Sequence, residues 1–262
     1  MRSRESTVGS VGSGCWALIA LACAIAAPVG AHAVAIVAPN GFESVDGDTG
    51  NLFPFFQSSI THSSMRYQQV YNASEFAAIA GGGGMITEIA FRAHSESPPF
   101  AAPIASIQIN LSTTANAADG LSTVFADNVG ADDTAVFGPA PFAVSSAQPA
   151  NFSGTAKPFE IIFPLLTPFF YDPALGNLLL DMRIPVQAAQ PLIATIAIDG
   201  TISESDAVSR VYSYYGDVNS PTADQVSTLG LITRFTATPV PEPSTALQLA
   251  LGLCALARAR RR

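Results

Sequence analysis

The stretch Ser106-Ile107-Gln108-Ile109-Asn110-Leu111-Ser112 decides the fold class, because apolar and polar residues alternate through it without interruption. A period of two places Ile107, Ile109 and Leu111 on one face of a strand and the polar residues on the other. The pattern predicts a strand with one face buried against a core.

A second stretch, Asn177-Leu178-Leu179-Leu180-Asp181-Met182-Arg183-Ile184, is apolar almost throughout. A run of this length without alternation is typical of a central strand that is covered on both faces. Asp181 and Arg183 interrupt it two residues apart on one face. We expect them to form a structural charge pair.

Short segments with strand character recur along the rest of the chain, separated by turn residues. Residues 85–93 alternate, with Thr87, Ile89 and Phe91 on one face and Glu88, Ala90 and Arg92 on the other. Ser74 to Ile79 is expected to form one or two helical turns. Pro98, Pro99 and Pro103 mark a loop, and 167–173 an aromatic turn. Further strands are expected at 34–38, 66–71, 135–137, 142–144, 159–163, 192–198, 208–215 and 231–237.

Composition supports the same class, because only 12% of residues are charged while Gly and Pro number 20 and 19. Low charge with many short apolar runs and turn residues favours β structure over helical bundles. We therefore predict an all-β fold: a single antiparallel β-sandwich, jelly-roll-like, of roughly 9 to 12 strands over residues 34–238.

The N-terminus reads as a secretory signal peptide over residues 1–33. Arg2 and Arg4 give a positive start, 15–27 is an apolar helical core, and Ala31 and Ala33 form a small-residue cleavage site for signal peptidase. Cleavage after Ala33 is expected, so the exported body begins at Val34.

All three cysteines, Cys15, Cys23 and Cys254, lie outside this body. The body therefore has no disulfide, thiolate metal site or cysteine nucleophile. A lipoprotein alternative would use Cys23, but Ala20 stands where a leucine is expected.

The C-terminal segment, residues 239–262, has three parts in a fixed order: a proline-rich motif, a short apolar run and a basic end. The apolar run, 245–257, is a good helix former, and the arginines would remain on the cytoplasmic face of a membrane. The residues that define the motif and the basic end are Pro241, Glu242, Pro243, Arg258, Arg260, Arg261 and Arg262.

This tail resembles the PEP-CTERM sorting signal of Gram-negative bacteria. The resemblance implies recognition by an exosortase, a membrane cysteine protease-transpeptidase thought to remove the tail, in species that make exopolysaccharide and biofilm. The alternative is a plain tail anchor. The 13-residue run reaches only about 20 Å, short of the ~30 Å hydrocarbon core, which suits a transient membrane segment better.

The body is acidic once the two ends are set aside. It contains six basic and eighteen acidic residues, which gives a net charge of −12. Such a body is not expected to bind nucleic acid through phosphates. It would be repelled by anionic lipid or by acidic polysaccharide unless divalent cations bridge them.

The segment Asp46-Gly47-Asp48-Thr49-Gly50 offers two carboxylates and could cradle Ca²⁺, or it is a solvated turn. An EF-hand loop would need a glutamate where Gln57 stands. The four glycines of 81–84 are not followed by Lys-Ser/Thr and a helix, so a phosphate-binding loop is rejected.

Two further regions are candidates for binding. The long polar segment 113–134 is either a ligand rim or a structured surface excursion. Tyr212 and Tyr214 share a face of one strand, with Tyr215 beside them, and form either a sugar-stacking platform or cross-strand packing.

No catalytic constellation is evident in the body. Its two histidines, His62 and His94, lie in loop-like surroundings, and no Gly-x-Ser-x-Gly elbow occurs. We expect no cofactor and no metal ligands. Glycoside hydrolysis needs only two carboxylates, so a carboxylate-pair glycosidase stays an alternative.

These features together predict an exported, non-enzymatic cell-surface or extracellular-matrix protein of a Gram-negative bacterium. It would be tethered to the inner membrane as a precursor and then sorted through a PEP-CTERM/exosortase pathway. Exopolysaccharide is the candidate partner outside the cell. A carbohydrate-binding β-sandwich is the first alternative.

Overall fold

The computed structural model contains two short 3-10 helices and thirteen strands among the residues it describes, ten of them four residues or longer. It describes residues 32–56, 64–152, 156–186, 197–204, 206–214 and 217–240, together with Gly252 and Arg258. The elements are β1 (Val34–Ala38), β2 (Thr49–Asn51), β3 (Met65–Tyr71), η1 (Ala73–Ile79), β4 (Gly84–Phe91), β5 (Phe100–Thr114), η2 (Phe125–Asn128), β6 (Thr134–Ser146), β7 (Ile161–Tyr171), β8 (Asn177–Ile184), β9 (Ile198–Thr201), β10 (Val208–Ser213), β11 (Gln225–Ser227), β12 (Gly230–Leu231) and β13 (Thr233–Pro239).

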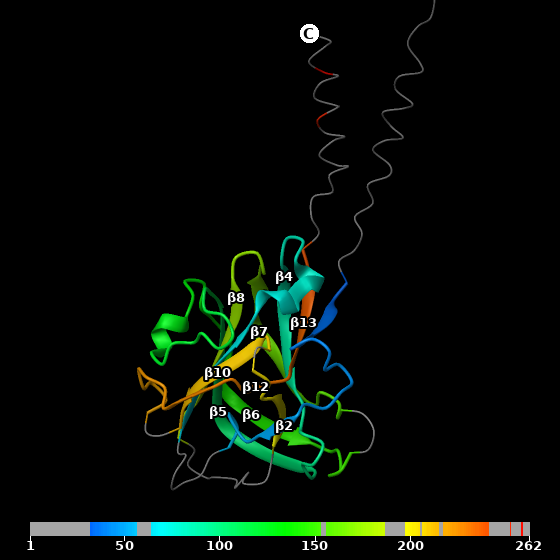
Figure 1. Cartoon of the computed structure of the whole chain (residues 1–262), viewed down its shortest axis with the longest axis vertical. Helices are drawn as coiled ribbons and strands as arrows, with labels where there is room; N and C mark the ends of the chain where they lie inside the picture. The colour runs from blue at the N-terminus through cyan, green and yellow to red at the C-terminus, as the bar shows by residue number, and fades with distance from the viewer. Residues whose placement is uncertain are drawn as a thin grey trace, which may run out of the picture. The chain divides into compact units, whose positions relative to one another are not determined.

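Two antiparallel sheets form the body (Figure 1). One has the strand order β1-β13-β4-β7 and the other β11-β10-β3-β8-β5-β6. The chain crosses between them from β3 to β4 and from β4 to β5, and it returns from β6 to β7 and from β7 to β8. This alternation is the strand order of a jelly roll, with β10 and β11 added beside β3. A small third sheet, β12-β9-β2, takes β9 and β12 from the connection between β8 and β13 and β2 from the connection between β1 and β3.

The core lies between the two sheets and is built from the inward faces of both. Ile109 of β5 and Leu180 of β8 belong to one buried cluster with Phe163 of β7 and Phe235 of β13. Tyr71 and Phe235 meet edge to face across it, with ring centroids 5.0 Å apart. The predicted antiparallel sandwich is therefore confirmed.

The strand β8 is central and covered on both faces, as predicted from its apolar run. It pairs with β3 on one side and with β5 on the other. Leu178 and Leu180 enter the main core, while Leu179 belongs to a second cluster on the opposite face. That second cluster exists because a long connection covers this face.

The connection between β5 and β6 supplies that cover. Phe125 of η2 is buried among apolar residues of the cover and the sheet, and the Arg66 guanidinium lies 4.3 Å from the centre of its ring. Asn128 donates to Gln68 at 2.9 Å and accepts from Asn116 at 2.8 Å. The polar segment 113–134 is thus a structured excursion that packs on the sheet.

The predicted loop is wrong at Pro103 and the predicted aromatic turn is wrong over 167–171, because these residues belong to longer strands, whereas Pro98 and Pro99 do lie in a connection. Pro103 lies within β5, where β6 is its only partner strand, and the missing proline N–H is tolerated on such an edge. The segment 167–171 completes β7, an edge strand, and the turn begins only at Asp172. Pro164 and Pro168 are exposed on β7. In the sequence, prolines at these positions suggest that the strand ends there, although it continues.

The face assignment predicted for β4 is wrong at its start. A register shift between Ile86 and Glu88 leaves Thr87 half-buried, while Ile86 is buried in the core with Ile89 and Phe91. A bulge adds one residue and reverses the alternation on one side of it. A strict period of two cannot anticipate it.

The segments 135–137 and 142–144 form one strand, β6, instead of two. Gly138 has φ of +74°, and a Cβ there would lie 2.0 Å from the Ile107 carbonyl oxygen. Glycine therefore permits the close approach at which β6 bends without ending. Of the remaining predicted strand segments, residues 192–196 and Tyr215 lie outside the described residues.

Candidate functional site

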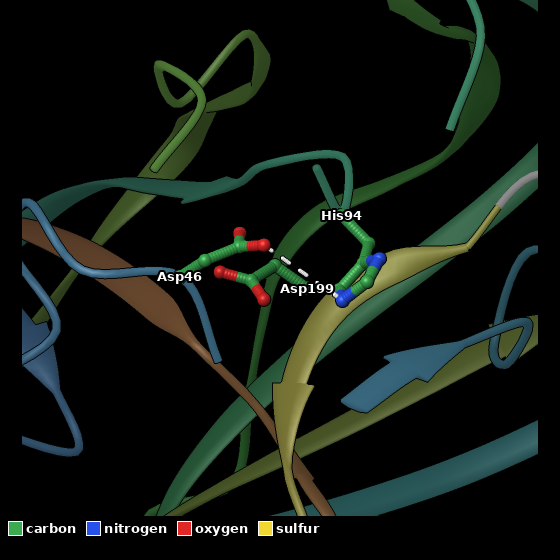
Figure 2. A group of neighbouring side chains, drawn as sticks. All are labelled: Asp46, His94 and Asp199. Atoms are coloured by element: carbon green, nitrogen blue, oxygen red, sulfur yellow. Dashed lines mark ion pairs between the residues drawn. The ribbon is translucent and has the colours of Figure 1, made fainter. Parts of the chain in front are cut away.

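Three side chains of metal-ligand type, Asp46, His94 and Asp199, meet beside β9 (Figure 2). One potential ligand atom from each lies within 4.8 Å of the other two. Asp46 is in the loop after β1, His94 follows β4, and Asp199 is in β9. A backbone bond from the His94 N–H to the Ala197 carbonyl (2.9 Å) fixes the histidine against the start of β9.

Asp199 is the buried member of the cluster, with its side chain 0% exposed. Its Oδ2 accepts a hydrogen bond from Arg92 Nε at 2.6 Å, and its Oδ1 accepts one from the Gly47 N–H at 2.9 Å. Burial raises the pKa of Asp199 to about 6; the Arg92 charge acts against this rise and the Asp46 carboxylate adds to it. The carboxylate is thus held by the fold at an energetic cost.

His94 and Asp46 form the more accessible side of the cluster. His94 Nε2 lies 3.8 Å from Asp46 Oδ2, which also accepts from the Ser95 N–H at 3.3 Å. The Glu96 N–H points to His94 Nδ1 at 3.4 Å, an arrangement that assigns the ring proton to Nε2. Asp46 Oδ1 is buried and has no hydrogen-bond partner among the residues that the structure describes.

The glycines of the Asp46–Gly50 segment let the loop approach β9. A Cβ on Gly47 would lie 2.0 Å from the Gly200 carbonyl oxygen, and one on Gly50 would lie 2.7 Å from the Ala197 side chain. Asp46 and Asp48, which the sequence offered either as a Ca²⁺ cradle or as a solvated turn, have different protein partners, and Asp48 Oδ1 accepts from the Ile202 N–H at 2.9 Å. Asp46 therefore contacts the connection after β4, whereas Asp48 contacts the backbone after β9.

The donor types suit a small divalent cation, since one imidazole nitrogen and two carboxylate oxygens are available. The neighbouring charges argue the other way. Arg92 is ion-paired to Asp199, and Lys157 is close enough for the Asp46 charge to oppose the lowering of its pKa by burial. Two cations already offset two carboxylates, so we assign no metal to the cluster.

The same two carboxylates resemble the acid pair that the glycosidase alternative requires. Asp199 has a raised pKa, as a general acid needs. Its side chain is nevertheless fully buried and both oxygens accept hydrogen bonds from the protein. A substrate oxygen cannot reach it in this conformation, and the cluster acts as a fastening between the loop and β9.

The tyrosine row of β10 takes part in packing. Tyr212 is 8% exposed, and its ring centre lies 4.9 Å from that of Phe53. Tyr214 stacks on Phe53 at 5.6 Å with an interplanar angle of 10°. The Arg210 guanidinium lies 4.7 Å from the Tyr212 ring centre on the other side. This arrangement matches the cross-strand packing interpretation of the row.

The predicted sorting residues lie almost entirely outside the described residues; these are Ala31, Pro241, Glu242, Pro243, Arg260, Arg261 and Arg262. Ala33 is exposed and directly precedes β1, and Arg258 is an exposed helical residue. In the part of the chain that the structure describes, no helix has the length and apolar character needed to cross a membrane. His62 also lies outside that part.

The meeting of His94 with Asp46 and Asp199 was missed by sequence reasoning, which set His94 aside as a loop residue. A partial signal was available in Asp46-Gly47 and Asp199-Gly200, two of the three Asp-Gly steps of the chain. Each marks a place where another backbone can approach closely, but neither says which backbone it is.

Comparison with known proteins adds no relative: no protein-family model, no curated protein and no solved structure matches the chain.

Proposed function

We propose that this chain is an exported, non-enzymatic cell-surface or extracellular-matrix protein that is sorted through a PEP-CTERM/exosortase pathway. The observation that carries the proposal is the ordered tail, Pro241-Glu242-Pro243 followed by the apolar run and the arginine cluster. The acidic, cysteine-free body between the two terminal segments is the part that this pathway would deliver. Exopolysaccharide is the expected surrounding.

The positions of the two proposed processing points support this reading. Val34 forms the first ladder pair of β1, with Ala237, so cleavage after Ala33 removes no strand residue. β13 ends at Pro239, one residue past the predicted boundary, and the Val240 N–H donates to the Gly83 carbonyl at 2.9 Å. Removal of the chain beyond the motif would leave every described ladder intact.

The contacts of the buried charges support a non-enzymatic body. Asp181 is bound by Arg66, Gln68 and Arg183, and Asp199 by Arg92 and the Gly47 N–H. Asp181 therefore joins β8 to β3, and Asp199 joins β9 to the loop after β1. Groups committed in this way are poor candidates for proton transfer to a substrate.

The test is intact mass and cell fractionation of the native protein beside a variant with Pro241→Ala, Glu242→Ala and Pro243→Ala. The native form is expected to begin at Val34, to lack the residues after the motif and to be released or displayed. The variant is expected to keep its tail and to stay in the inner membrane. Circular dichroism of both should agree, because the substitutions lie beyond β13.

The proposal fails if both proteins keep Arg262 and both remain in the membrane, since the tail is then only an anchor. The two alternatives have separate tests. Binding of the native protein on a glycan array, abolished by Tyr214→Ala, would favour a carbohydrate-binding module. Hydrolysis of a glycan that is lost in Asp46→Asn would favour the carboxylate-pair glycosidase.

A further inference from the structure

Both termini of the folded body leave from the same end of one sheet. Val34 pairs with Ala237, so β1 begins where β13 ends. Gly84 pairs with Pro239 on one side and with Tyr171 on the other. The start of β4 and the end of β7 therefore lie at this end too (Figure 1). We call the surface formed here by residues 77–83, 170–176 and 239–240 the terminal face.

The terminal face carries exposed apolar side chains. Phe170 is 46% exposed, Leu175 73% and Val240 39%. The neighbouring exposed residues of 77–82 are alanines and glycines. An uncharged surface of this kind is suited to an apolar environment and not to binding a charged partner.

The two most prominent side chains are mounted on ordered backbone. The Phe170 ring lies over Gly83, where a Cβ would come within 2.9 Å of it. Leu175 is on a turn closed by its own N–H to the Asp172 carbonyl (3.0 Å) and by the Tyr171 hydroxyl, which donates to the Gly176 carbonyl at 2.9 Å. The face is therefore preformed and does not need to be ordered on contact.

Charge is nearly absent from these segments. Residues 73–84, 171–177 and 239–240 contain no Lys or Arg, and their carboxylates are Glu75 and Asp172. Glu75 is buried and accepts from the Asn40 N–H, while half-buried Asp172 accepts from the Ala174 N–H at 3.0 Å. Contact with lipid headgroups would leave both acceptors occupied within the protein.

We propose that the terminal face rests on the lipid surface while the precursor is tethered, an inference that depends on the proposed membrane-held tail. The apolar run begins at Thr245, five residues after Val240, a distance of about 17 Å when fully extended. A membrane-inserted tail therefore holds this end of the body at the headgroup region. The resulting high effective concentration makes a small apolar contact sufficient.

The contact is expected to depend on the tether. Membrane attachment through a few apolar side chains is weak alone and becomes stable with a second anchoring element. Removal of the tail therefore releases the face together with the body. Because the face has no basic residue and the body carries a net charge of −12, anionic lipid is expected to weaken the contact, and added salt is expected to reduce that weakening.

The test uses tryptophan fluorescence, since the chain contains one tryptophan, Trp16. The full chain with Trp16→Phe and Leu175→Trp is reconstituted into phosphatidylcholine vesicles with brominated acyl chains. The matched control carries Val45→Trp, which is 56% exposed beyond the opposite end of β4, on the loop that binds Arg92. Co-flotation with the vesicles reports the tether independently.

We expect at least about twofold quenching for the reporter at position 175 and little for the one at position 45. Adding Phe170→Ser should reduce the quenching at position 175. Equal quenching at both positions, or none at position 175 in a co-floating protein, overturns the lipid contact while leaving the tethered tail intact. A chain that does not co-float overturns the tethered tail and the contact with it.

Discussion

Two buried arginine–aspartate pairs fasten two long connections of this molecule, and they differ in how well the carboxylate is supported. Asp181 Oδ2 accepts from Arg66 at 2.9 Å, from Gln68 at 3.0 Å and from Arg183 at 3.2 Å. Arg66 also lies over the Phe125 ring of the covering excursion. Three donor side chains thus share one acceptor.

Asp199 has less support. One side chain, Arg92, donates to it, together with the Gly47 N–H, and a second carboxylate, Asp46, lies nearby. Arg92 is itself fully buried, and in the described part of the chain its Nη1 has no hydrogen-bond partner. Burial dominates here, and the pKa of Asp199 rises to about 6.

The contrast shows that the ion pair alone does not determine how much a buried charge contributes to the free energy of unfolding. The number of remaining donors around the carboxylate decides how much is lost when the arginine is removed. The Asp199 site should therefore depend strongly on its arginine, and the Asp181 site should tolerate the same change better.

The largest effect is expected for Arg92→Leu. It leaves the Asp199 carboxylate buried and without a cation, which should lower the free energy of unfolding by about 3–5 kcal/mol at neutral pH. Urea denaturation of the purified protein measures this loss. Arg92→Leu combined with Asp199→Leu should recover most of it, and a loss below about 1 kcal/mol in the single variant would contradict the assignment.

A smaller effect is expected for Arg66→Leu. Gln68 and Arg183 still donate to Asp181, so the loss should be about 2–3 kcal/mol, including the lost contact with Phe125. The same denaturation experiment ranks the two variants. A loss equal to that of Arg92→Leu would show that the extra donors do not compensate.

The pH dependence isolates the Asp199 carboxylate. Its pKa of about 6 lies above that of an unfolded aspartate, so the folded chain binds this proton more tightly and protonation favours folding. The contribution is fully present below about pH 4 and is lost as the pH rises to about 6, with a size of roughly 3 kcal/mol.

Stability should therefore fall with rising pH over this window in the parent and not in Asp199→Asn. Burial also raises the pKa of Asp206 to about 6, which acts in the same direction. Both proteins are accordingly compared in an Asp206→Asn background. If the stability of the two proteins changes with pH in the same way, Asp199 is not the cause of the pH dependence.

The smallest effect is expected for replacing one glycine by alanine in each of two connections, the loop after β1 and the excursion between β5 and β6. A Cβ on Gly47 would lie 2.0 Å from the Gly200 carbonyl oxygen, so Gly47→Ala should cost about 1–2 kcal/mol as the loop moves away from β9. Gly120→Ala, in the excursion over β3, meets its nearest atom at 3.3 Å and should change stability by less than about 0.5 kcal/mol. Thermal denaturation compares the two, and a reversed order would contradict the close approach.

Much of the fold follows from local pattern. The alternation of 106–112 and the apolar run of 177–184 correctly predicted one strand with a core-facing side and one central strand. The errors lie where a strand runs through proline, at Pro103 and Pro168, and at the bulge after Ile86. Edge position and register permit these features, and neither is visible in a short window of sequence.

The candidate cluster could be predicted only in part. The Asp46–Gly50 segment stood out by its carboxylates and glycines, but the sequence suggested Ca²⁺ or solvent as the partner of these carboxylates. In the structure, the partners of Asp46 are His94 and the Ser95 N–H, and Gly47 binds Asp199. These residues are far apart in the chain and meet through the third sheet.

The sequence by itself determined the fold class and the position of most strands, because side-chain alternation is set by the backbone period and needs no knowledge of partners. The terminal segments and the sorting function they predict also come from sequence alone. Only the tertiary structure decided that Asp46, His94 and Asp199 meet, that Arg92 pairs with Asp199, and that the start of β1 and the end of β13 lie at the same end of the sheet as the end of β7. Such contacts depend on sheet order and register, which bring together residues whose separation along the chain carries no periodic signal.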